Sequence, residues 1–169
     1  AVAFFQQAYD LAPTPVRQLG VGRALMLLPG KLAEARSLMQ QALTAFEAAG
    51  DCQGRINAGL YLAGSYLSTS DGAQVLYWAR RVLPDLELVD DVTLHASAHY
   101  LMGTAKFRNG YSLTEAATHY AAATRLAAAH QPESELALMS WFEWGNLALE
   151  AGEWVDAIAK FQQARRVAQ

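Results

Sequence analysis

Apolar side chains recur along the chain at helical spacing, with small and bulky residues in a fixed order. The order is clearest in Trp141-x-x-Trp144-Gly145-x-x-Ala148, Gly152-x-Trp154 and Ala157-x-x-x-Phe161-x-x-Ala164. Small residues fit where two helices cross closely, bulky residues interlock between helices, and a glycine permits the turn. The pattern predicts two helices that pack as a hairpin.

The spacing of the second of these helices returns four more times towards the start of the chain. The copies are Ala116-x-x-x-Tyr120-x-x-Ala123, Val75-x-x-x-Ala79-x-x-Val82, Ala35-x-x-x-Met39-x-x-Ala42 and Ala1-x-x-x-Phe5-x-x-Ala8. From the first copy to the last, the intervals are 34, 40, 41 and 41 residues. A period in this range is the signature of a helical repeat array, in which each unit packs on its neighbours.

Capping and turn residues predict the helix boundaries. Thr14-Pro15 and Gly50-Asp51 start new helices, Ser112-x-x-Glu115 is a capping box, and Pro132 precedes another helix. We expect helices near residues 1–11, 15–28, 31–49, 52–68, 72–83, 91–108, 113–130, 133–151 and 154–168. The predicted hairpins are 15–49, 52–83, 91–130 and 133–168, preceded by an orphan second helix at 1–12.

The predicted fold is therefore all-α, a right-handed superhelix of about four and a half helical hairpins in a single array over residues 1–169. The orphan helix, and the missing polar cap after the last helix, indicate a fragment of a longer protein.

Composition agrees with a helical fold and narrows the function. Alanine is abundant, 53% of residues are hydrophobic and only 17% are charged, which argues against disorder. A net charge of −3 gives no electrostatic basis for direct nucleic-acid binding. No apolar run approaches the roughly 18 residues of a membrane span. Cys52 has no partner for a disulfide, so we expect a cytoplasmic protein.

The repeat pattern resembles the tetratricopeptide repeat (TPR) family over essentially the whole chain. The longer period of about 40 residues, the link Ala48-Ala49-Gly50-Asp51 and the run Ala79-Arg80-Arg81-Val82-Leu83-Pro84 leading into Leu101-Met102-Gly103 are similar to the MalT-type subclass of LuxR-type bacterial transcriptional activators. That resemblance implies a sensor module between a P-loop ATPase and a helix-turn-helix domain. A generic TPR scaffold for protein assembly, unrelated to transcription, is the alternative.

The resemblance also implies a concave groove that binds a protein, a peptide or a small-molecule inducer. The family's groove positions correspond here to Arg17, Ala24, Asn57, Leu60, Gly64, Tyr100, Thr104, Phe142 and Asn146, with Ser68, Arg108 and Glu150 at its edge. This lining favours a neutral or mixed ligand. TPR domains that clamp acidic chaperone tails use a Lys-Asn pair on one helix. Here Phe142 replaces the lysine and Asn146 alone matches, so we do not expect such a tail as the ligand.

Several residues admit a structural explanation. The packing signature of the repeat accounts for Trp141, Trp144, Gly145, Gly152, Trp154, Ala157, Phe161 and Ala164, so we expect the tryptophans in the core. Phe142 is an aromatic residue whose position around the helix lies outside this packing signature. For Phe142 and Tyr100, ligand contact and simple half-burial stay equally open.

Catalytic and metal-binding patterns are absent from the sequence. His95 and His99 have the spacing of a chelating pair, but no third ligand is evident and His99 occupies a packing position. His119 and His130 are expected to be isolated surface or capping residues. No G-x-x-x-x-G-K-[ST], G-x-S-x-G or H-E-x-x-H motif occurs. We therefore expect a binding module without a cofactor rather than an enzyme.

Overall fold

A computed structural model describes residues 14–169, and within that range every regular element is a helix. The helices are α2 (Pro15–Leu25), α3 (Leu32–Ala49), α4 (Cys52–Leu67), α5 (Gly72–Arg81), α6 (Leu83–Leu86), α7 (Val92–Arg108), α8 (Leu113–His130), α9 (Glu135–Glu150) and α10 (Trp154–Val167). The all-α expectation is confirmed. The helix expected at 1–12 lies outside the described residues.

Side-chain caps begin α2 and α4 at the residues that the sequence predicted. Thr14 Oγ1 accepts a hydrogen bond from the Arg17 backbone N–H at 3.3 Å, with Pro15 in the first turn of α2. Asp51 accepts one from the Gly54 N–H at 2.8 Å. Gly50 ends α3 with a φ of 68°, a left-handed conformation that glycine adopts without strain.

Three boundaries differ from the expected ones. Helix α2 ends at Leu25 rather than near 28, and α9 begins at Glu135, because Ser134 rather than Pro132 provides its cap. The helix expected at 72–83 ends at Arg81, and the separate short helix α6 follows. Pro84 explains this break, since it lacks a backbone N–H but fits the first turn of a new helix.

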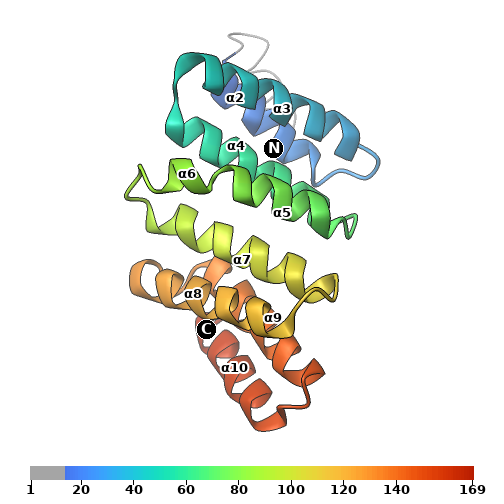
Figure 1. Cartoon of the computed structure of the whole chain (residues 1–169), viewed down its shortest axis with the longest axis vertical. Helices are drawn as coiled ribbons and strands as arrows, with labels where there is room; N and C mark the ends of the chain where they lie inside the picture. Colours follow the sequence, from blue (N-terminus) through green and yellow to red (C-terminus); the bar gives the residue numbers. More distant parts are fainter. Residues whose placement is uncertain (1–13) are drawn as a thin grey trace.

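The helices stack along the long axis of the molecule in chain order, from α2 and α3 at one end to α10 at the other (Figure 1). Four pairs of consecutive helices pack as hairpins: α2 on α3, α4 on α5, α7 on α8 and α9 on α10. The first helices also contact one another in the order α2, α4, α7, α9. They form a continuous inner layer, so the molecule is a helical solenoid.

The repeat positions lie at the hairpin contacts. Ala35, Met39 and Ala42 of α3 are fully buried, and the same is true of Ala116, Tyr120 and Ala123 of α8. The corresponding side chains of Val75 and Ala79 in α5, and of Val82 directly after it, are also buried. The small residues allow close helix crossing and the larger ones fill the space between helices.

The core expectation for one tryptophan needs correction. Trp154, the first residue of α10, is 64% exposed. Its neighbour Val155 and Ile158, one turn later, are exposed too, so the other described helices leave this face of α10 largely uncovered. Trp141 and Trp144 are half-buried and stacked, with ring centroids 5.4 Å apart.

Among the described helices, none is both long enough and apolar enough to cross a membrane.

Candidate partner-binding pocket

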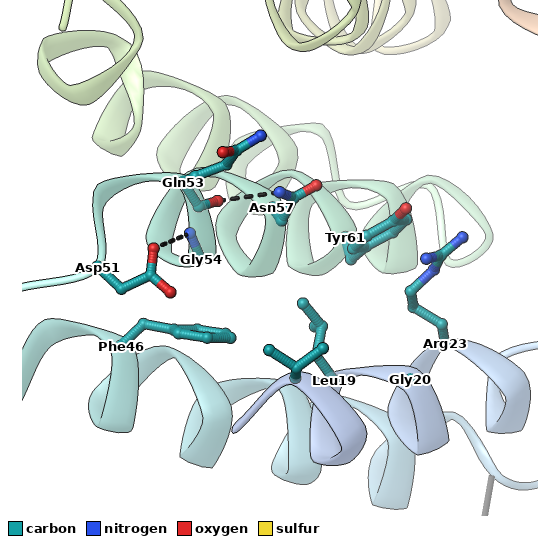
Figure 2. A pocket seen from close by; sticks show the side chains of 10 residues that line it. Leu19, Gly20, Arg23, Phe46, Asp51, Gln53, Gly54, Asn57 and Tyr61 are labelled. Carbon is teal, nitrogen blue, oxygen red and sulfur yellow. Dashed lines mark hydrogen bonds between the residues drawn. The ribbon is translucent and has the colours of Figure 1, made fainter. Parts of the chain in front are cut away.

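A pocket of about 430 Å³ opens between α2 and α4, the first helices of two successive hairpins. Its wall on α2 comes from Val16, Leu19, Gly20 and Arg23, and its wall on α4 from Gln53, Gly54, Asn57 and Tyr61. Phe46 of α3 and Asp51 complete the lining (Figure 2). The pocket thus lies on the layer of first helices, where a solenoid presents its inner surface.

Glycine and phenylalanine together shape one end of the pocket. A Cβ atom at Gly54 would collide with the ring of Phe46, so the missing side chain lets that ring lie directly against α4. Asp51 caps the same turn through Gly54, which fixes the start of α4 beside the ring. Figure 2 shows Phe46 and Asp51 together at this end, with Leu19 between them and the opposite end.

The opposite end of the pocket carries a stacked cation. The guanidinium of Arg23 lies 4.1 Å from the ring centroid of Tyr61, which is a favourable cation–π geometry. The long side chain of Arg23 extends across the gap between α2 and α4 (Figure 2).

Amide and carboxylate groups lie between and beside these ends. Asn57 Nδ2 donates to the backbone carbonyl of Gln53 at 2.9 Å, which orients the Asn57 carboxamide along the helix. One carboxylate oxygen of Asp51 is used in the helix cap. The lining therefore combines one cation, one carboxylate, two amides and apolar surface, a mixture suited to a peptide backbone with side chains of mixed character.

The structure does not bring the expected groove residues together in one site. Asn57 lines the pocket, whereas Arg17 is exposed on α2 outside the lining. Phe142 is 51% exposed on α9, with its ring centroid 5.7 Å from that of Phe161 on α10. Asn146 is half-buried on the same helix.

Four of the expected lining residues need correction, because their side chains are in the core. Ala24 and Leu60 are each 6% exposed, Tyr100 is 7% exposed, and Thr104 is fully buried. Thr104 Oγ1 accepts a hydrogen bond from the Tyr120 hydroxyl at 3.1 Å and donates to the Tyr100 carbonyl at 2.9 Å. A side chain packed and bonded in this way holds α7 on α8 and offers no surface to a partner.

The sequence pattern missed Arg23, Gln53 and Tyr61. A signal for two of them was present, because Gln53, Asn57 and Tyr61 follow one another at intervals of four and so share one face of α4. Identifying that face required knowing which side of α4 faces α2, and the repeat pattern alone did not provide this.

A second polar group lies further along the inner layer, where α7, α8 and α9 meet. Arg108 pairs with Glu143, whose side chain is 7% exposed. Burial raises the pKa of the Tyr100 and Tyr120 hydroxyls, and the nearby Glu143 carboxylate raises them further. Both hydroxyls therefore stay protonated over the ordinary pH range.

Metal binding gains no support in the part of the chain that the structure describes. No group of three or more histidine, cysteine or acidic side chains is placed to hold an ion there. Cys52 is half-buried, with Sγ 3.5 Å from the Asp85 carbonyl. His119, expected to be isolated, instead lies against His99, with 3.0 Å between the two Nδ1 atoms.

Comparison with known proteins identifies the fold. No protein-family profile matches the chain, and no curated protein sequence matches it. Among solved structures, one similar chain is a crystal structure of nearly identical TPR-like repeats assigned to a kinesin light chain of Podospora anserina. The TM-score is 0.71 at 17% sequence identity, and the match covers 98% of this chain and 84% of that one. The chain therefore has the fold of a TPR-like helical repeat protein.

Proposed function

We propose that this chain is a protein-interaction module that binds an extended peptide segment of a partner in the pocket between α2 and α4. The TPR-like fold is typical of protein-interaction modules. The pocket is the observation that carries the proposal: about 430 Å³, lined by a stacked Arg23–Tyr61 pair and by the Asn57 amide on the inner layer of helices.

Peptide selection tests this proposal. Peptides from a random display library would be selected on the full chain and their Kd measured by titration. Tyr61→Ala removes an aromatic wall of the pocket, and we expect it to weaken binding by roughly 5- to 150-fold, as at aromatic hot spots. Tyr111→Ala is the matched control, because Tyr111 is an exposed tyrosine outside the pocket lining.

Both variants need a melting temperature close to that of the wild type for the comparison to hold. Equal affinity of wild type and Tyr61→Ala for every selected peptide would place the binding surface elsewhere. In that case Phe142→Ala tests the expected site on α9, where the exposed ring leaves surface for a ligand.

The narrower proposal is that the module is the sensor of a bacterial MalT-like transcriptional regulator, with a small-molecule inducer or a protein as its ligand. It rests on the repeat intervals of 40 and 41 residues. The short helix α6, between α5 and α7, accounts for some of the added length. The complete gene decides it. A P-loop ATPase motif before residue 1 and a helix-turn-helix after residue 169 would support it, and a gene with neither would leave the scaffold role.

A further inference from the structure

Two imidazole rings meet between the helices of the third hairpin. His99 on α7 and His119 on α8 have their Nδ1 atoms 3.0 Å apart, with ring centroids separated by 5.3 Å and planes inclined by 43°. Two ring nitrogens at this distance need something between them, since two lone pairs or two N–H groups would repel each other. The simplest solution is a shared proton, with one Nδ1 donating and the other accepting.

We propose that His99 and His119 form a pH-sensitive contact that holds α7 against α8 at neutral pH and opens as the pH falls towards 5. The observation behind it is the direct contact of two half-buried rings from the two helices of one hairpin. The contact is separate from the pocket between α2 and α4, and it does not depend on the proposed function.

The charges around the pair favour neutral rings. His95 on α7 and Arg125 on α8 act on His99, and Lys106 on α7 and Arg80 on α5 act on His119. Glu115 opposes them at His119, but its carboxylate is paired with Lys106. Glu87, between α6 and α7, lines a cavity of about 200 Å³ together with His95 and His99.

Burial is the largest cause that lowers the pKa of both rings, and neighbouring groups lower it further. For His99 the further lowering comes from His95 and Arg125, and for His119 it comes mainly from His99 itself and from Lys106. Each ring is thus easier to protonate in the unfolded chain than in the folded one.

Protonation affects the contact in two stages. The first proton can enter the donor ring at Nε2, away from the contact, and adds a positive charge to cationic surroundings. The second proton must enter the accepting Nδ1, which removes the acceptor and places two cations side by side. Because the unfolded chain takes up protons first, the contribution of the pair is complete above about pH 6.5 and is lost progressively below it.

A shared metal ion is the other way to join two Nδ1 atoms, and the surroundings disfavour it. Lys106, Arg80 and Arg125 would repel a divalent cation. Over residues 14–169 no third histidine, cysteine or acidic side chain completes a metal site. A proton needs no further ligand, so the geometry favours it.

Thermal unfolding of the full chain tests the proposal. Melting temperatures at pH 7.5, 6.0 and 5.0, in the presence of EDTA, would be compared for wild type and for His99→Gln/His119→Gln. The wild type should lose about 2–4 °C more than the double variant between pH 7.5 and 5.0. His130→Gln is the matched control, since His130 is exposed at the end of α8, and it should keep the wild-type pH dependence.

Three results would overturn the proposal. One is an equal pH dependence in wild type and the double variant. Another is a zinc-dependent rise of the wild-type melting temperature at pH 7.5 that the double variant lacks, which would assign the pair to a metal. If the double variant does not fold, the NMR titration of His99 and His119 in the wild type decides. Both rings should titrate below pH 6.5, and titration at or above that value contradicts the shared-proton contact.

Discussion

Arg55 on α4 forms a bidentate ion pair with Asp85 on α6 through two parallel hydrogen bonds. Arg55 Nε donates to Asp85 Oδ2 at 2.9 Å and Nη2 donates to Oδ1 at 2.7 Å. This bidentate arrangement fixes direction as well as distance. It attaches the short helix α6, which has only one turn of its own, to the helix that forms one wall of the candidate pocket.

The first prediction concerns this pair. Asp85→Asn should lower the melting temperature at pH 7, because it removes the charge that the fork of Arg55 recognises. The hydrogen bond to Arg55 lowers the pKa of Asp85. A lowered carboxyl pKa means that the stabilisation is complete above the unfolded pKa of about 3.9 and is lost as the pH falls through the folded value. The difference between wild type and variant should therefore shrink below pH 4 in a series of thermal melts.

Asp156→Asn is the control for Asp85→Asn. Asp156 pairs with Lys160 one turn along α10 and is about half exposed, so its loss should change the melting temperature little. Equal effects of the two substitutions would show that the Arg55–Asp85 fork does not anchor α6.

The second prediction concerns a close helix crossing. A Cβ atom at Gly145 on α9 would lie 2.6 to 3.0 Å from three ring atoms of Phe161 on α10. Gly145→Ala should therefore destabilise the chain by about 1–3 kcal/mol, because the Phe161 ring must move out of its packing position. Denaturant unfolding with a common m-value measures the loss.

Gly64 provides the matched control, since it is a helical glycine with room for a methyl group. The nearest atom to its Cβ would be Leu101 Cδ2 at 3.9 Å. Gly64→Ala should be neutral or stabilise the chain by up to about 1 kcal/mol through helix propensity. A loss at Gly64 as large as at Gly145 would contradict the steric explanation.

The sequence predicted the hairpin contacts well because packing there depends on size and spacing within one helix. Met39 and Tyr120 occupy equivalent positions of the repeat and are both fully buried. Local caps were equally predictable, since Asp51 and Ser112 act on residues three positions away. These features need no information about neighbouring hairpins.

Features that depend on how hairpins face each other were not predictable. One residue turns a side chain by about 100° around a helix axis, so a small error in phase moves it from a groove to the core. That is why Arg17 lies outside the pocket while Gly20 and Arg23 line it. The contact of His99 with His119 lies within one hairpin, but it was not predictable either, because the spacing of residues in sequence does not set the register between α7 and α8.

The third prediction separates two tryptophans that the repeat pattern treats alike. Trp144 stacks on Trp141, and Lys160 Nζ lies 4.3 Å from the centroid of its ring. Trp144→Ala should therefore cost about 3 kcal/mol in unfolding free energy, towards the lower end for large aromatic truncations because the ring is only half-buried. Trp154→Ala should stay within about 0.5 kcal/mol, because its exposed side chain leaves no cavity. Unfolding in denaturant measures both, and a large loss at Trp154 would mean that α10 is covered in solution, for example by a second copy of the chain.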